Sequence, residues 1–278
     1  MGLKRLKKEN LWMFDQYNRR INYLRISVTD RCNLRCTYCM PEEGIEQIAH
    51  SDILSFEEII TFVNVAVKEG FEKVRITGGE PLVRKGIISL IASLAQIPEI
   101  KDLSMTTNGV LLKQFAKQLR EAGLQRINVS LDTIDANKYK QITRVGNIKD
   151  VTEGLLLAKE LGFSPIKLNC VISKNSMEPD AIAVKEFADK NGFLVRFIPK
   201  MDLDNGTFGI VEGGEGGDCS ICNRLRLTAN GILKPCLFNN LGYSVRELGA
   251  EQALSLALAN KPKCGTINQN GEFYNIGG

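Results

Sequence analysis

The segment "DRCNLRCTYC", residues 30–39, places three of the eight cysteines of this 278-residue chain within eight positions. Cys32, Cys36 and Cys39 follow the pattern C-x3-C-x2-C, and a loop with this spacing can turn three thiolates toward one point. A structural zinc site normally takes four ligands, and no fourth cysteine or histidine is spaced for it here. A cubane iron–sulfur cluster takes one ligand per iron, so three cysteines leave one iron open. The spacing favours the cluster, and the alternatives are a zinc loop or buried thiols.

The sequence on both sides of this loop predicts an α/β fold. Short runs rich in Val, Ile and Leu alternate with longer amphipathic stretches, which is typical of buried parallel strands joined by right-handed helical crossovers. The expected strands are 23–28, 73–77, 102–107, 126–131, 166–172 and 194–198, and the expected helices are 55–70, 86–96, 111–122, 149–162 and 178–191. The pattern predicts six βα repeats, curled into a partial (β/α)6 barrel of the TIM type or laid open.

Unusual residues follow the ends of the first three expected strands. The cysteine loop comes after the first strand, "GGEP" (78–81) after the second, and "TNG" (107–109) after the third. Functional sites of parallel α/β folds lie at the carboxyl ends of their strands. We therefore expect these three segments to meet in one site, where Arg31 and Arg35 would help offset the charge of a bound thiolate cluster.

A second cysteine group lies near the C-terminal end, after the Gly-rich stretch 199–218. Cys219, Cys222 and Cys236 are spaced C-x2-C-x13-C in a segment with a hairpin turn predicted at "NG" (230–231). Cys264 is a conceivable fourth ligand, so a zinc ribbon is the main alternative to an iron–sulfur cluster here. The remaining Cys170 lies on an expected buried strand, which favours a thiol in the core.

Cationic residues on the expected strands point to an anionic substrate. Arg224 and Arg226 are two apart on a strand and therefore face the same side, as a site that grips phosphate requires. Four further cations lie on expected strands: Arg25, Arg75, Lys167 and Arg196. A buried charge is costly without a partner, so the four together favour a triphosphate-sized anion in the barrel. Strand periodicity alone would also allow one or two of them on a solvated edge.

Composition narrows the class of protein. No apolar run approaches the roughly 20 residues of a membrane span, and the basic N-terminus lacks the apolar core of a signal peptide, so a cytoplasmic protein is expected. Eight cysteines in a reducing compartment favour metal or redox chemistry over a disulfide framework. His50 is the single histidine and is expected to be a solvated loop residue. The net charge of +4 suits an anionic small molecule and shows no concentrated basic stripe beyond residues 4–8.

Two levels of family resemblance follow from these motifs. "CNLRCTYC" and "GGEP" resemble the cluster-binding and cofactor-binding motifs of the radical S-adenosylmethionine (SAM) superfamily. The segments at 24–44, 74–86 and 219–238 and the terminal "IGG" resemble the molybdenum cofactor biosynthesis protein A family, the GTP 3',8-cyclases. The resemblance covers residues 15 to 200 and 219 to the end.

The resemblance implies a lyase that converts GTP to (8S)-3',8-cyclo-7,8-dihydroguanosine 5'-triphosphate, the first step of molybdenum cofactor biosynthesis. It implies two 4Fe–4S clusters and SAM as cofactors, and a radical that takes the ribose 3' hydrogen before the ring closes onto C8 of guanine. An external one-electron reductant and a pterin-forming partner enzyme are implied as well. Neither a membrane nor a nucleic acid is expected as a partner, and a homodimer is one assembly that the resemblance allows.

The resemblance also assigns residues. The clusters are assigned to Cys32, Cys36 and Cys39 and to Cys219, Cys222 and Cys236. SAM is assigned to Tyr38, Gly79, Ser130 and Met201. GTP is assigned to Arg25, Lys73 or Arg75, Thr106, Lys167, Arg196, Arg224 and Arg226, and the tail that reaches into the site to Gly277 and Gly278.

The expected domain organisation has three parts: a radical SAM partial barrel (1–200), a shortened Gly-rich linker (201–218) and a C-terminal cluster-binding extension with the Gly-Gly tail (219–278). The family carries a longer segment before the second cysteine group, and a glutamate where this chain has Pro199. The shortening is expected to remove one wall of the substrate pocket. Two alternatives therefore stay open: a two-cluster paralogue acting on another nucleotide or a peptide, and a zinc-stabilised nucleic-acid-binding module.

Overall fold

The computed structural model describes residues 13–201 and 208–266, and a single mixed sheet lies at its centre. Nine strands are hydrogen-bonded in the order β6-β5-β4-β3-β2-β1-β7-β8-β9. They are β1 (Tyr23–Ser27), β2 (Lys73–Thr77), β3 (Asp102–Thr107), β4 (Arg126–Ser130), β5 (Ile166–Ile172), β6 (Leu194–Pro199), β7 (Arg224–Leu227), β8 (Ile232–Lys234) and β9 (Tyr243–Ser244). Strands β1 to β7 pair in parallel, whereas β8 and β9 are antiparallel additions.

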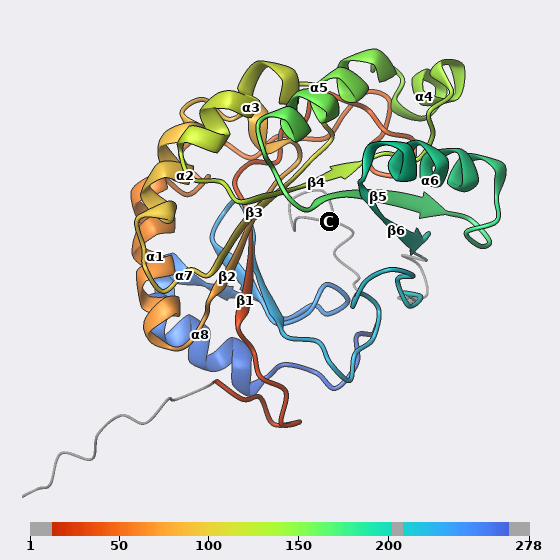
Figure 1. Cartoon of the computed structure of the whole chain (residues 1–278). Coiled ribbons are helices and arrows are strands. Elements are labelled where there is room, and N and C mark those ends of the chain that lie inside the picture. Colours follow the sequence, from red (N-terminus) through yellow and green to blue (C-terminus); the bar gives the residue numbers. More distant parts are fainter. Residues whose placement is uncertain (1–12, 202–207, 267–278) are drawn as a thin grey trace, which may run out of the picture.

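The helices lie on the convex face of this curved sheet, where α8, drawn in blue, lies beside α1 (Figure 1). They are α1 (Phe56–Lys68), α2 (Ile87–Ala95), α3 (Leu112–Glu121), α4 (Ala136–Thr143), α5 (Ile148–Glu160), α6 (Pro179–Asn191), α7 (Val245–Leu248) and α8 (Ala250–Ala259), with a 3-10 turn at Pro81–Val83. The sheet does not close between β6 and β9. The predicted partial barrel of parallel strands is therefore confirmed.

Alternation along the strands separates the apolar core from the polar interior. In β1, Leu24 and Ile26 are fully buried and pack in the main core with residues of α1 such as Phe62. Successive side chains of a strand point to opposite faces, so Tyr23 and Arg25 face the concave side of the sheet. Helix α1 starts at the capping box that its sequence predicts, with Ser55 and Glu58 satisfying each other's backbone donors. The core thus lies under the helices and leaves the concave face free for polar residues.

Two features of the fold go beyond the sequence-based expectation. Helix α4 lies between β4 and β5 in a stretch that the sequence analysis leaves unassigned. Strand β7 opens the predicted hairpin, and it pairs in parallel with β1, so that Tyr23 is level with Arg224 and Arg25 with Arg226. The segment that carries the second cysteine group therefore continues the same sheet as the barrel.

The Gly-rich stretch before the second cysteine group contacts both β6 and β7. Phe197 on β6 exchanges backbone hydrogen bonds with Glu212, with N···O distances of 3.0 and 3.1 Å. The guanidinium of Arg224 donates to the carbonyl of Glu215 at 3.4 Å. A Cβ added to Gly213, which has φ of +77°, would lie 2.6 Å from the carbonyl oxygen of Val195, so the close approach requires glycine here. No helix in the described part of the chain is long and apolar enough to cross a bilayer.

Candidate active site

The first cysteine loop leaves the carboxyl end of β1 and is held against the turn that follows β2. The amide of Gly79 donates to the carbonyl of Thr29 at 2.7 Å, and the amide of Glu80 donates to the carbonyl of Arg31 at 2.8 Å. A Cβ at Gly79 would lie 2.3 Å from the carbonyl oxygen of Arg31, closer than van der Waals contact allows. The "GGEP" turn is therefore glycine-rich because backbone packs directly on the backbone of the cysteine loop.

The opposite side of the loop is held by Arg144, which follows α4. Its guanidinium donates to the carbonyl of Arg35 at 2.6 Å and to the carbonyl of Met40 at 3.0 Å, on either side of Cys36 and Cys39. The amide of Arg35 in turn donates to the carbonyl of Thr143 at 3.2 Å. The loop is thus fixed between the end of β2 and the end of α4.

Burial governs the protonation of the first three thiols. It raises the pKa of Cys32 to about 11 and that of Cys36 to about 12, and it also raises the pKa of Cys39. Arg31 and Arg35 were expected to help offset the charge of bound thiolates, but here they bind other groups. Arg31 pairs with Asp30 at 3.1 Å. Arg35 donates to the carbonyls of Cys32 and Leu34, both at 2.9 Å. Both cations are committed to the backbone or to a carboxylate.

Buried Glu80 connects the "GGEP" turn with the end of β3. Its carboxylate is completely buried and accepts from the Thr107 hydroxyl and the Asn108 amide, both at 2.7 Å, and from the Leu82 amide at 3.0 Å. Burial raises its pKa to about 7. Asn108 then donates toward the Sγ of Cys32 at 3.7 Å. The three segments that the sequence analysis expects at one site do meet there.

A small cavity beside the first cysteine group joins two of the residues assigned to SAM. Cys36, Tyr38, Ser130 and Asp132 are among its lining residues. The hydroxyl of Tyr38 donates to Asp132 Oδ2 at 2.7 Å, while Asp132 Oδ1 accepts the amide of Val171 at 2.8 Å. Asp132 was not predicted, although its position two residues after Ser130, at the carboxyl end of β4, is a usable signal.

Met201 does not line this cavity. It packs with Phe208 against the small apolar cluster of Leu237 and Phe238, which also contacts Cys236. Its assignment to SAM stays a prediction.

The concave face of the sheet holds the predicted cations together. Arg25 is 8% exposed, level with Arg75 on β2 and with Arg226 on β7. Burial lowers the pKa of Arg25 well below its usual range, and the charges of Arg226, Arg75 and Arg224 lower it further. Lys167 responds in the same way, with burial and then Arg196 lowering its pKa. These cations therefore crowd one polar interior, although Lys167 and Arg196 are only half-buried and Arg196 lies on the edge strand β6.

Aromatic and amide groups order this interior. The guanidiniums of Arg75 and Arg224 lie 5.3 and 5.7 Å from the ring centroid of Tyr23, within cation–π range. Arg75 also donates to Ser104 at 3.2 Å and, with the amide of Asn128 oriented as its neighbours require, to the Asn128 oxygen at 2.7 and 3.1 Å. Tyr23 and Asn128 were not predicted, because neither residue type is distinctive on a strand.

Several polar atoms of the interior have no hydrogen-bond partner within the described residues. They are Tyr23 Oη, Thr106 Oγ1, Asn169 Oδ1, Arg196 Nε and Arg224 Nε. Buried polar atoms normally find partners. Unsatisfied atoms among crowded cations indicate a site for a polar, anionic ligand. Lys73 begins β2, level with Tyr23 at the amino end of the sheet.

The second cysteine group is assembled by the β7–β8 hairpin. Cys219 and Cys222 precede β7, and Cys236 follows β8, so antiparallel pairing returns the third cysteine to the first two. The charge of Lys261 acts on both Cys222 and Cys236. Burial would raise the pKa of Cys222, but Lys261 and Arg224 outweigh it and lower that pKa. The exposed Cys264 interacts with Cys219.

Each group offers three free thiols, the number that leaves one iron of a cubane open. All eight cysteines lie within the described ranges and are free thiols. Within those ranges, no three His, Cys, Asp or Glu side chains converge on the position of a single metal ion. A cubane distributes its thiolates over separate irons, so it needs a wider arrangement of three cysteines than one zinc ion does. Cys170 is 1% exposed in the main core, which confirms the sequence-based expectation, and His50 is exposed.

Comparison with known proteins decides the family. The Radical SAM superfamily model matches residues 26–188. The chain is 43% identical to a GTP 3',8-cyclase of Thermodesulfovibrio yellowstonii, covering 85% of this chain and 88% of that protein. A GTP 3',8-cyclase of Petrotoga mobilis is 38% identical, with 94% and 97% covered. The chain belongs to the GTP 3',8-cyclase family of the radical SAM superfamily.

Two solved structures share the architecture of this GTP 3',8-cyclase family member. Streptococcus suis SuiB bound to the precursor peptide SuiA superposes with a TM-score of 0.67 at 17% identity, over 88% of this chain and 66% of SuiB. Methylornithine synthase (PylB) gives 0.53 at 16% identity, over 86% and 71%. At these identities the likeness concerns the fold alone.

The family comparison also agrees with a shortened chain. The alignment with the Petrotoga mobilis relative spans 313 positions, more than the 278 residues available here. That relative therefore carries residues that this chain lacks. Within the structure, the short stretch 208–218 contacts β6 and β7 itself, at Phe197 and Arg224. Gly277 and Gly278 lie outside the described residues.

Proposed function

We propose that this protein is a GTP 3',8-cyclase that converts GTP to (8S)-3',8-cyclo-7,8-dihydroguanosine 5'-triphosphate, the first step of molybdenum cofactor biosynthesis. One observation carries the proposal: a buried, cation-lined barrel interior lies beside two groups of three free cysteines. The interior supplies charge complementary to a nucleoside triphosphate, and the cysteines supply ligands for two clusters. Family membership at 38–43% identity supports the same reaction.

At the first site, Cys32, Cys36 and Cys39 would hold a 4Fe–4S cluster, and the position left open would receive SAM. When bound, this cluster supplies the electron that cleaves SAM and so begins the radical reaction. The protein's task is to orient SAM against the cluster. Tyr38 and Ser130 line the adjoining cavity, and Gly79 allows the close backbone contact that shapes the loop.

At the substrate site, the triphosphate would lie among the cations of the concave face. The set proposed to bind it comprises Arg25, Lys73 or Arg75, Thr106, Lys167, Arg196, Arg224 and Arg226. Most of these guanidiniums have pKa values lowered by burial and by one another. A bound polyanion relieves that repulsion, so the interior is organised for an anionic substrate before it arrives.

The second group, Cys219, Cys222 and Cys236, would hold another 4Fe–4S cluster with one iron open to the guanine base. Arg224 lies between this group and the ring of Tyr23, close to the proposed triphosphate. Chain segment 208–218 would cover part of the open side of the sheet beside β6 and exclude water, because its backbone is hydrogen-bonded to Phe197. An external one-electron reductant, a pterin-forming enzyme that takes the product, and assembly as a homodimer belong to the same proposal.

The proposal is tested by measuring the metal content of the protein and of two variants, each with one cysteine replaced by serine. Anaerobically reconstituted protein should hold roughly eight irons, four for each cubane, and should cleave SAM when reduced. Cys222→Ser should hold roughly four irons, retain SAM cleavage and lose turnover of GTP. Cys264→Ser is the matched control, since it removes an exposed thiol beside Cys219 that the three-cysteine ligand set does not include.

The alternatives give different results in the same experiment. Zinc in place of iron at the second group, lost equally from Cys222→Ser and Cys264→Ser, would establish a four-cysteine zinc site. Roughly eight irons with SAM cleavage but no consumption of GTP would refute GTP as the substrate.

A further inference from the structure

Lys261, just after α8, is a buried cation that no step of the proposed reaction uses. Its side chain is 1% exposed, among the most completely buried large side chains of the described residues. Lysine is rarely buried to this extent unless it is paired. Its ammonium donates to the carbonyl of Pro235 at 2.7 Å and to the carbonyl of Arg224 at 2.9 Å. The ammonium therefore links two separate parts of the hairpin that carries the second cysteine group.

Both carbonyls adjoin cysteines of that group. Pro235 directly precedes Cys236, and Arg224 comes two residues after Cys222. The charge of Lys261 acts on the thiols of both Cys222 and Cys236. One side chain thus contacts the two backbone segments that set the distance between these thiols, and it places positive charge beside them.

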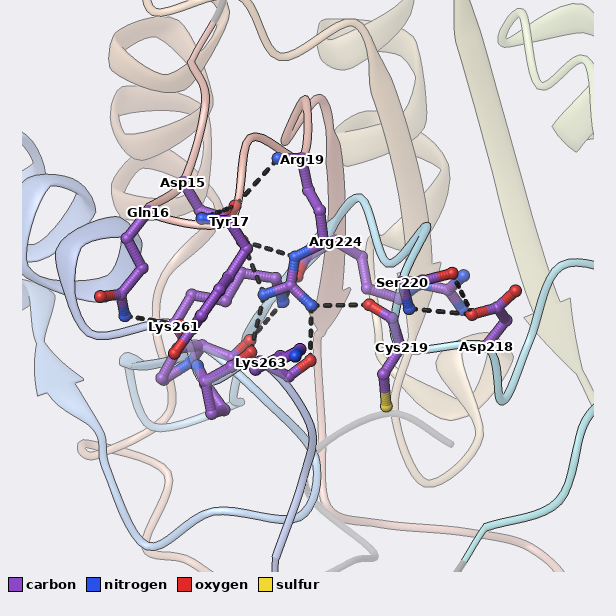
Figure 2. Close-up of polar contacts among 12 residues, drawn as sticks. Asp15, Gln16, Tyr17, Arg19, Asp218, Cys219, Ser220, Arg224, Lys261 and Lys263 are labelled. Carbon is purple, nitrogen blue, oxygen red and sulfur yellow. Dashed lines mark hydrogen bonds and ion pairs between the residues drawn. The ribbon is translucent and has the colours of Figure 1, made fainter.

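The segment containing Lys261 is itself anchored by the start of the described chain (Figure 2). The guanidinium of Arg19 donates to the carbonyls of Pro262 and Lys263 at 2.6 and 2.8 Å, and to the carbonyl of Cys219 at 2.6 Å. Asp15, whose side chain is fully buried, holds this guanidinium with an N···O distance of 2.6 Å. Cys219, the remaining cysteine of the group, is therefore tied through Arg19 to the same backbone segment that positions Lys261.

We propose that Lys261 is a positioning residue for the second cysteine group: its ammonium holds the segments of Cys222 and Cys236 together and stabilises a negatively charged cluster bound there. This role rests on the proposed function, since it requires that the group holds a cluster. Hydrogen bonds and charges around the ligands of a metal centre fix their orientation and tune its potential. Lysine suits this position because it carries three donors and a compact charge.

Iron content in a chain without the first group tests the role directly. Replacing Cys32, Cys36 and Cys39 with serine leaves only the second group, and this background protein should hold roughly four irons. Adding Lys261→Met should remove more than half of that iron, or leave a cluster whose midpoint potential is lower because a nearby cation is gone. Lys263→Met is the matched control, because its side chain is exposed, and it should change neither value.

Measurements on the chain with all its cysteines show whether Lys261 serves the second cysteine group alone or the whole barrel. Lys261→Met should retain reductive cleavage of SAM, which depends on the first group. Because guanine is proposed to bind the open iron of the second cluster, GTP should change the electron paramagnetic resonance spectrum of the reduced protein, and Lys261→Met should lose this change. Unchanged iron content and potential in the background protein would overturn the role. Loss of SAM cleavage as well would also overturn it, since Lys261 would then serve the whole barrel. A background protein that binds no iron would overturn the proposed second cluster itself.

Discussion

Replacing Arg226 with methionine should stabilise the ligand-free, metal-free protein while weakening its binding of GTP. Arg226 is 7% exposed on β7, level with Arg25. Burial, followed by the charge of Arg224, lowers the pKa of Arg226 from 12.5 to about 10, despite an opposing effect of Cys236 and Cys222. Because the folded state disfavours the charged form, the cost is fully present at neutral pH, where Arg226 is charged.

The magnitude follows from that pKa. A fall from 12.5 to about 10 corresponds to about 3 kcal/mol of folding free energy, since each tenfold change in a proton equilibrium is about 1.4 kcal/mol. Methionine keeps much of the apolar stem of arginine, so most of its packing survives the substitution. Contacts of the guanidinium are lost, and we therefore expect a net gain of about 1 to 3 kcal/mol.

Urea unfolding with and without GTP measures both effects. A ligand at 100 times its Kd stabilises the folded state by about 2.7 kcal/mol, and Arg226→Met should lose most of this increment. Arg126→Met is the control, because Arg126 already pairs with Asp102, with Nε 3.0 Å from Oδ1, so its loss should destabilise the protein. If Arg226→Met lowers the unfolding free energy by more than about 2 kcal/mol and leaves the GTP increment intact, the charge-crowding argument is wrong.

Three further predictions concern the first cysteine loop. The buried Glu80, with its pKa raised to about 7, contributes stability that is full below about pH 4.5 and is lost as pH rises through 7. Between pH 4.5 and 7, Glu80→Gln should therefore remove about 3 kcal/mol of the pH-dependent fall in unfolding free energy. An unchanged dependence of the unfolding free energy on pH would contradict the prediction. Gly79→Ala, whose Cβ would lie 2.3 Å from the Arg31 carbonyl oxygen, should lose the iron of the first group and SAM cleavage; retention of both would refute the packing argument. Arg144→Met should lose the same iron while the second group keeps its own, and equal losses from both groups would show a general folding role.

Much of the fold follows from local sequence patterns. All six barrel strands lie within one residue of their expected bounds, because short β-branched runs between capped amphipathic helices give a strong signal. Helix α4 was missed, since "ANKYKQIT" is short and polar and buries only Tyr139 and Thr143. The parallel pairing of β7 with β1 joins residues about 200 positions apart, and no local pattern reports a contact of that range.

Some residues of the candidate site were likewise predictable from local sequence, and others were not. Cysteines at strand ends and cations on apolar strands are conspicuous because their surroundings make them costly, so the sequence analysis found them. Arg144 and Lys261 act through backbone carbonyls of distant segments. Every residue has a backbone carbonyl, so the sequence of the contacted segment does not indicate that it accepts such a hydrogen bond. These two cations became visible only when the fold placed each one beside a cysteine group.

The barrel is proposed to direct radical chemistry at the ribose of GTP. The most direct test uses GTP carrying deuterium at the 3' position, incubated anaerobically with reconstituted, reduced protein and SAM. Deuterium should appear in 5'-deoxyadenosine, and a cyclised nucleoside triphosphate should form in step with it. Cleavage of SAM that leaves 5'-deoxyadenosine unlabelled and GTP unchanged would show that the radical does not act on the ribose of GTP.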